Sequence, residues 1–204
     1  PEKACRRQEQ AAHGIAIAQQ LALPAPVQEA IAQHHEMMDG SGFPRQLPGS
    51  RISQAGKVLA LVNRYENLCN PARASAAVTP HEALSLIFSQ MRDRHDNTVL
   101  AAFIRMMGVY PPGSVLQLSD GRHALVVSVN SARPLKPRVL VHDTGIAREE
   151  ALILDLEHAP TAAIRRSLRP DQLPREAMAY LAPRLRICYF FERSVDPVRG
   201  EIVP

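Results

Sequence analysis

The stretch HHEMMDGSGFP, residues 34–44, is the part of the sequence that decides the fold and the site. It opens with His34-His35-Glu36 followed by Asp39, a cluster of metal-capable side chains at the end of a helical segment. Adjacent helical residues point about a third of a turn apart, so His34 and His35 cannot easily chelate one ion together. The pair serves either two neighbouring ions or one ion and a substrate phosphate; a helix cap or a surface pair is the alternative. Imidazole and carboxylate without thiolate favour iron, manganese or zinc.

The second half of the block predicts a loop. Gly40 and Gly42 allow backbone conformations that other residues avoid, and Pro44 cannot continue a helix. Asp39 offers a carboxylate that can cap its own turn. The block therefore joins a helix end to a tight, glycine-rich turn.

Apolar residues at helical spacing surround the block on both sides. The third helical segment carries this spacing through Ala55, Val58, Leu59, Val62 and Tyr65. Thr79 followed by Pro80 predicts an N-cap and a first helical residue. The expected helices cover residues 12–21, 26–34, 52–68, 80–91 and 97–107.

The period changes near Tyr110. Residues 115–118 and 124–129, joined by a turn at 119–121, predict a β-hairpin. Two more strands are expected at 138–142 and 151–156 and a helix at 174–181, whereas residues 186–192 are ambiguous. The predicted fold class is mainly α: a helical domain over residues 1–109, followed by a small β-rich extension with a terminal helix over residues 110–204.

Composition narrows the class of protein. The 204 residues are 46% hydrophobic and 22% charged, which is typical of a soluble globular protein, and no apolar run is long enough to span a bilayer. Three separated cysteines favour a reducing cytoplasm over a disulfide scaffold. The net charge of +4 comes without a nucleic-acid motif. Arg165, Arg166 and Arg169 form either a solvated face or a basic face for an acidic partner. Because no Met opens the chain, we take it as a fragment.

The block resembles HHExxDGxGYP, the signature of HD-GYP proteins, a branch of the HD phosphohydrolase superfamily. The likeness extends through residues 49–68, 79–84, 96–103 and 110–113, and the tail over residues 167–192 is similar to an extension found in some members. The resemblance implies an HD-type helical bundle that holds two or three metal ions, usually including iron. It also implies hydrolysis of cyclic di-GMP in bacterial second-messenger signalling.

The same resemblance suggests site residues. His34 and His35 would each bind a metal ion, with His13 and Asn63 as looser candidates for further ligands. On the substrate side the candidates are Gly42, Phe43, Pro44 and Arg73.

Four departures from the family pattern bear on activity. The HD pair with its nearby lysine is absent, and Asn63 stands where the family has a metal-binding Asp. Ala72 and Ser75 occupy positions of phosphate-contacting basic residues, with Arg73 adjacent as a substitute. Phe43 replaces the Tyr of the signature, which removes a hydroxyl group and keeps the ring. No catalytic residue is assigned, since Lys57 is better explained as a helix-surface residue.

Three functions stay open at this point. The first is a metal-dependent phosphodiesterase acting on cyclic di-GMP or a related cyclic dinucleotide. The second is a degenerate domain that regulates or binds a partner, such as a GGDEF-type protein. The third is an HD phosphohydrolase with another nucleotide substrate. A homodimer is a further expectation, and the isolated histidines His81, His95, His123, His142 and His158 are expected to be structural or on the surface.

Overall fold

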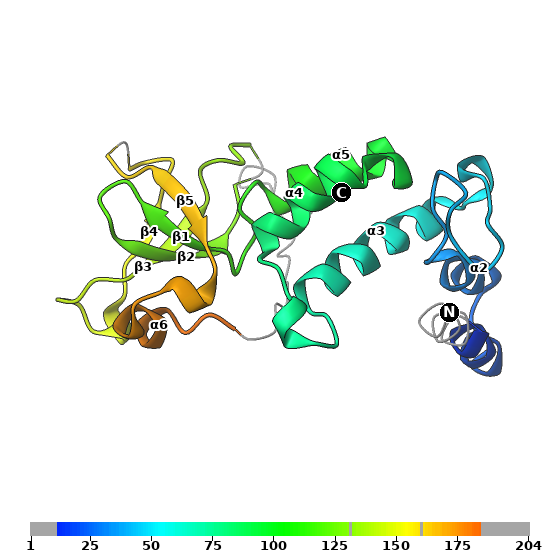
Figure 1. The fold of residues 1–204 in the computed structure, drawn as a ribbon, viewed down its shortest axis with the longest axis horizontal. Coiled ribbons are helices and arrows are strands. Elements are labelled where there is room, and N and C mark those ends of the chain that lie inside the picture. Colours follow the sequence, from blue (N-terminus) through cyan, green and yellow to red (C-terminus); the bar gives the residue numbers. More distant parts are fainter. Residues whose placement is uncertain (1–11, 131, 160, 185–204) are drawn as a thin grey trace, which may run out of the picture.

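The structure is a computed structural model of the chain and describes residues 12–130, 132–159 and 161–184. Helices occupy the first half and an antiparallel sheet the second, and the two parts lie at opposite ends of an elongated molecule (Figure 1). Cys5, Cys188 and the ambiguous segment over residues 186–192 lie outside the described residues. Within them, no helix is long and apolar enough to cross a membrane.

The helices begin and end where local signals place them. A helix over residues 12–20 is followed by α2 (Ala25–Gln33), α3 (Gln54–Cys69), α4 (Pro80–Gln90) and α5 (Asn97–Met107). Thr79 accepts from the Glu82 backbone N–H while the Glu82 carboxylate accepts from the Thr79 N–H, so α4 has a complete capping box. Asp96 caps α5 in a similar way, and Gly108 ends it at φ +69°. The five predicted helices are confirmed, and each helix end that borders described residues lies within two residues of its predicted position.

The buried face of α3 differs from the predicted one. Val58, Leu59 and Val62 are 40, 39 and 41% exposed. Of the predicted residues Tyr65 is buried, and the other buried residues of the helix are Gly56, Ala60, Leu61 and Cys69. The reason is a close crossing with α2: a Cβ added at Gly56 would lie 2.6 Å from Oε1 of the buried Gln33. Gly56 allows this approach to α2, and Leu61, Tyr65 and Cys69 further along the same side of α3 enter the hydrophobic core.

The helical part has its own core. It is built where α3, α4 and α5 meet, and Tyr65 and Phe103 pack edge to face with their ring centroids 5.2 Å apart. The buried members are Leu61, Tyr65, Cys69, Ala83, Leu84, Ile87, Val99, Leu100, Phe103 and Met107.

Five strands form one antiparallel sheet in the order β4-β3-β2-β1-β5. Their bounds are Val115–Leu118 (β1), His123–Ser128 (β2), Arg138–Val141 (β3), Ile153–Asp155 (β4) and Ile164–Leu168 (β5). The predicted hairpin and the next two strands are confirmed, but β5 was missed. Its sequence, IRRSL, puts two arginines in succession and breaks the alternation that marks a strand. Such charges are typical of an edge strand, which is the position β5 takes.

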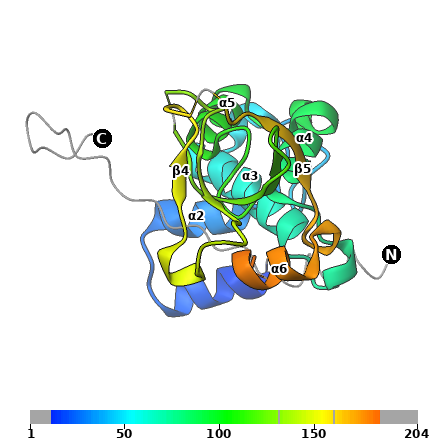
Figure 2. The same ribbon diagram turned by 90° about the vertical axis from the view of Figure 1, so that its left-hand side faces the viewer.

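The sheet carries a second core on one face and the helix α6 (Arg175–Leu181) beside it. Ala177 and Leu181 of α6 pack with Val115 and Leu168. Figure 2 looks at the sheet from its own end of the molecule and shows α6 running below the strands. The terminal helix predicted at this position is therefore confirmed.

Candidate functional site

The histidine pair lies where α2 ends. Gln33 is the last residue of α2 and His34 is its C-cap, so the chain leaves the helix at the first histidine. Both histidines line a cavity of about 120 Å³ together with Phe43 of the following loop and Asn63 of α3. The other lining residues are Met37, Ala60, Arg64 and Asn67. The structure thus brings together four of the eight residues predicted for the site.

The His34 ring is oriented by the helix from which it emerges. Its Nδ1 lies 2.5 Å from the carbonyl oxygen of Ile31, one turn earlier. A carbonyl oxygen only accepts, so Nδ1 donates, and in the neutral ring Nε2 keeps a lone pair. A backbone acceptor behind the ring is the usual support of a metal-binding histidine. His34 therefore fits a metal ligand.

His35 is packed between rings and held from α3. Its ring centroid lies 3.9 Å from that of His34 and 4.5 Å from that of Phe43, which stacks on it at 28°. Its Nδ1 lies 3.2 Å from the side-chain nitrogen of Asn63. Asn67, one turn further along α3, donates to the Asn63 side-chain oxygen at 2.9 Å. Loss of the Tyr hydroxyl at position 43 leaves this ring stacking intact.

Glu36 positions the loop. Its side chain is buried, with Oε1 accepting from the Arg45 N–H at 2.7 Å and Oε2 from the Leu47 N–H at 2.9 Å. Both carboxylate oxygens are therefore engaged by the loop backbone, and Glu36 is not among the residues that line the cavity. The carboxylate that the sequence grouped with the histidines thus binds the loop backbone instead.

Asp39 caps its own turn, as predicted. Its Oδ1 accepts from the Ser41 N–H at 2.9 Å and from the Ser41 hydroxyl at 2.6 Å. The Ser41 hydroxyl and N–H, which stabilise the charged form, hold the pKa of Asp39 below its usual value, helped by Arg94. Asp39 is exposed, so it too serves the loop.

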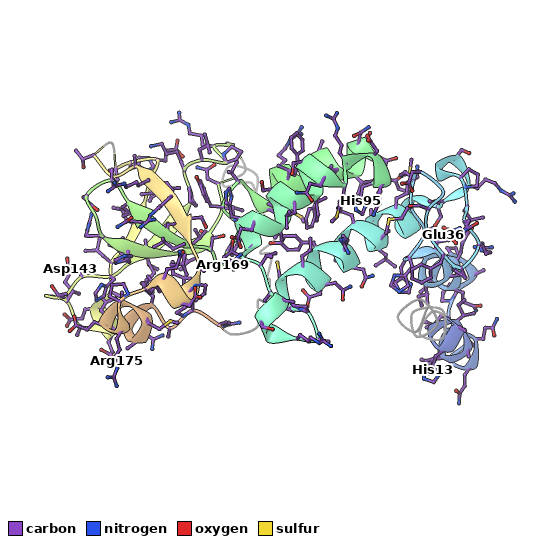
Figure 3. The ribbon with its side chains drawn as sticks, viewed as in Figure 1. His13, Glu36, His95, Asp143, Arg169 and Arg175 are labelled. Carbon is purple, nitrogen blue, oxygen red and sulfur yellow. The ribbon has the colours of Figure 1, made fainter. Side chains whose placement is uncertain are left out.

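The remaining predicted residues lie outside the cavity lining. His13 is exposed on the helix over residues 12–20, and Figure 3 shows it on a different side of that end of the molecule from Glu36. Arg73 is exposed beyond the C-terminal end of α3. Pro44 is exposed after a cis Phe43-Pro44 bond, and Gly42 is buried against the backbone of Glu36 and Met37.

Arg64 and Asn67 are cavity residues that the sequence analysis did not identify. Both lie on α3, one and four residues after Asn63, and no motif marks them. Arg64 adds a positive charge to a cavity already lined by two imidazoles. The burial of His95 lowers its pKa to about 4, and the charges of Arg64 and Arg94 contribute. Lys57, expected on the helix surface, pairs with Asp96 at 3.1 Å and is only 17% exposed.

The described side chains do not fit a cluster of two or three metal ions. Among residues 12–130, 132–159 and 161–184, no three His, Cys, Asp or Glu side chains come close enough to hold one ion. His34 has the orientation of a ligand, whereas His35 faces an amide. The site in this part of the chain thus offers one well-oriented imidazole, His34, in a cavity that Arg64 also lines.

Comparison with known proteins agrees with the sequence motif. A family model described as an HD domain matches residues 1–99. A protein of Pseudomonas aeruginosa named as a cyclic di-GMP phosphodiesterase is 28% identical over 117 residues, which cover 57% of this chain and 28% of that protein. Another of the same name from Vibrio cholerae is 31% identical over 90 residues, 44% of this chain and 16% of that protein. The chain thus spans less than a third of either relative. The HD domain match, these relatives and the HHEMMDGSGFP block together support the resemblance of the chain to HD-GYP proteins.

Proposed function

We propose that this chain forms part of a metal-dependent phosphodiesterase domain that acts on cyclic di-GMP in bacterial second-messenger signalling. The observation that carries the proposal is the cavity lined by His34, His35 and Phe43 of the HHEMMDGSGFP block together with residues of α3, among them Asn63 and Arg64. The names of the two relatives support cyclic di-GMP as the substrate.

The cavity suits one phosphodiester group of such a substrate. Its volume of about 120 Å³ is well below the several hundred cubic ångströms of a site that encloses a drug-sized ligand. A cyclic dinucleotide would therefore insert a phosphate and leave its bases on the rim. Arg64 supplies the charge that attracts the phosphate, and Phe43 supplies an aromatic edge at the rim. His34 Nε2 is the atom that would hold a divalent ion, and iron, manganese and zinc all accept imidazole.

A second candidate is a regulatory domain of the same fold that binds the nucleotide or a partner without hydrolysing it. Asn63 favours it, because an amide carries no charge and cannot bridge two ions as a carboxylate does. In this form the domain would act through another signalling protein, for which a GGDEF-type cyclase is our candidate. An HD phosphohydrolase with a different nucleotide substrate remains the third hypothesis.

The test is to measure metal content, cyclic di-GMP binding and cyclic di-GMP hydrolysis on the same preparation. Hydrolysis that requires iron, manganese or zinc and is lost in His34→Ala supports the phosphodiesterase. Binding without hydrolysis at any metal supports the regulatory domain. Neither binding nor hydrolysis of cyclic di-GMP would reject both, and hydrolysis of another cyclic nucleotide would support the third hypothesis. His158→Ala is the matched control, because that side chain is 79% exposed and lies in the sheet part.

A further inference from the structure

The orientation of the Asn67 side chain is fixed by the backbone of α3. Its amide nitrogen donates to the carbonyl oxygen of Asn63 at 2.7 Å. If this amide were turned over, two oxygen atoms would face each other at that distance, and neither could donate. The nitrogen of Asn67 therefore points at Asn63.

Asn63 is fixed in turn. Its side-chain oxygen lies 2.9 Å from the same Asn67 nitrogen and must be the acceptor there. The nitrogen of Asn63 is then the atom that lies 3.2 Å from His35 Nδ1. An amide NH₂ group only donates, so Nδ1 of His35 accepts.

The hydrogen bond at Nδ1 of His35 also determines the state of its other ring nitrogen, Nε2. A neutral imidazole carries one hydrogen, and when Nδ1 accepts, that hydrogen is on Nε2. His34 has the opposite form, because its Nδ1 donates to the Ile31 carbonyl. The two adjacent rings, whose centroids are 3.9 Å apart, are thus held in opposite tautomers by two different helices.

We propose that His35 is a hydrogen-bond donor through Nε2 and not a metal ligand, so that His34 is the one imidazole of the pair that presents a lone pair to an ion. This rests on the proposed function only in treating the pair as the metal-binding histidines. An Asp at position 63 would reverse the arrangement: one carboxylate oxygen would still accept from Asn67, and the other would accept from His35 Nδ1–H. The Nε2 lone pair of His35 would then face outward as a ligand. Asn63 is in this sense a positioning residue that acts through His35.

The experiment is a long-range ¹⁵N–¹H correlation spectrum of the histidine-labelled protein, which distinguishes ring nitrogens that carry hydrogen from those with a lone pair. In the wild type we expect hydrogen on Nε2 of His35 and on Nδ1 of His34. Added Zn²⁺, which is diamagnetic, should shift the resonances of the His34 ring nitrogens when one ion binds. The His35 resonances should stay unchanged, with hydrogen on Nε2 and a lone pair on Nδ1. Hydrogen on Nδ1 of His35, or direct binding of Zn²⁺ to its ring nitrogens, would overturn the proposal, as would a His34 ring that does not respond to Zn²⁺.

Variants test the role of position 63. Asn63→Asp should move the hydrogen of His35 to Nδ1, make its Nε2 respond to Zn²⁺ and raise Zn²⁺ affinity roughly tenfold or more. Asn67→Ala releases the Asn63 amide and should give a mixture of His35 tautomers. Asn97→Asp adds the same charge at an exposed position of α5. It should change neither the His35 tautomer nor the Zn²⁺ affinity. Failure of Asn63→Asp to move the hydrogen would also overturn the proposal. Because none of these readouts needs cyclic di-GMP, loss of the proposed activity leaves their outcome unaffected.

Discussion

Glu36 and Gly42 hold the loop after α2 from opposite sides. Glu36 accepts two N–H groups of the loop, from Arg45 and Leu47. Gly42 lies against the backbone that carries Glu36, where a Cβ would be 2.3 Å from the Met37 nitrogen and 2.4 Å from the Glu36 Cα. Since both neighbours are backbone atoms, they cannot move aside without shifting the end of α2. The glycine is required by contact and not by a left-handed backbone.

Gly42→Ala should therefore lower the free energy of unfolding by more than about 2 kcal/mol, because overpacking against backbone cannot relax. Gly40→Ala is the matched control: Gly40 has φ +75° but nothing within 4 Å of an added Cβ. It should cost only about 1 kcal/mol, the price of a left-handed alanine. Urea denaturation measures both, and equal losses would contradict the contact argument.

His95 predicts a pH dependence of stability. It is 5% exposed, and burial first, then Arg64 and Arg94, lower its pKa to about 4, whereas Asp39 acts in the opposite direction. Between pH 6.5 and 4, the unfolded chain, with a histidine pKa near 6.5, therefore binds a proton at this residue, whereas the folded chain does not. The contribution of His95 to the free energy of unfolding is fully present above pH 6.5. As the pH falls from 6.5 towards 4, the protein loses about 3 kcal/mol of stability through this group.

His95→Gln should reduce the slope of the free energy of unfolding against pH between pH 6.5 and 4. The reduction should correspond to at most one bound proton, and urea denaturation at several pH values measures it. His158→Gln, at an exposed histidine, should leave the wild-type slope unchanged. A wild-type slope in His95→Gln would show that another group causes the acid sensitivity.

At the scale of elements, the helices were predictable because their signals are local. Thr79, Pro80 and Glu82 stand within four residues and specify the start of α4 without help from the rest of the chain. The inward face of α3 was not predictable, because it depends on how closely Gly56 approaches Gln33 of another helix. The strand β5 was hidden for the same reason, since pairing with β1 and not its own pattern makes it a strand.

The residues of the site divide in the same way, into those that a local motif predicts and those that only contacts between helices bring together. His34, His35 and Phe43 are adjacent in sequence, so a motif identified them. The hydrogen bonds from Asn67 to Asn63 and from Asn63 to His35 form only because one turn of α3 packs against the end of α2. No sequence pattern predicts that packing. The His34 tautomer follows from a contact within α2, whereas the His35 tautomer depends on a contact with α3 that residue types alone do not reveal.

The capping box of α4 can be tested directly. Thr79→Ala removes the acceptor for the Glu82 N–H and should cost about 1 kcal/mol of stability. Thr144→Ala, at an exposed position in the sheet part, should change stability by less than about 0.5 kcal/mol. Thermal unfolding of the two variants decides the point, and a negligible effect of Thr79→Ala would mean that Glu82 and Pro80 suffice to start the helix.

At the scale of the molecule, the helical part and the sheet part have buried clusters that share no residue. Contacts between the parts include the stacking of the His81 ring on Tyr110, with centroids 4.8 Å apart, and Arg169 to Glu82, 3.2 Å. A cavity of about 280 Å³ lies between the start of α4 and the end of β5. An exposed ion pair contributes little, so coupling between the parts is expected to be weak.

We therefore predict that the division near residue 109 is also a division in stability. Phe103→Ala should destabilise the helical part by about 3–5 kcal/mol and leave amide exchange in β1 to β4 unchanged. Leu116→Ala should destabilise the sheet by about 2–5 kcal/mol and leave α3 to α5 unchanged. Hydrogen exchange followed by mass spectrometry reports both halves at once. Joint loss of protection in either variant would mean that the chain unfolds as a single unit.

The Asn63 contact with His35 also bears on how the site can change over generations. Asn and Asp have nearly the same shape, and their codons differ by one base, so a single transition in the gene exchanges them. Neither form empties the cavity or breaks α3, and no unfolded intermediate separates them. With Asn63 in the positioning role proposed above, one mutational step exchanges the tautomer of His35, and with it the lone pair that the ring presents, without a change in side-chain size.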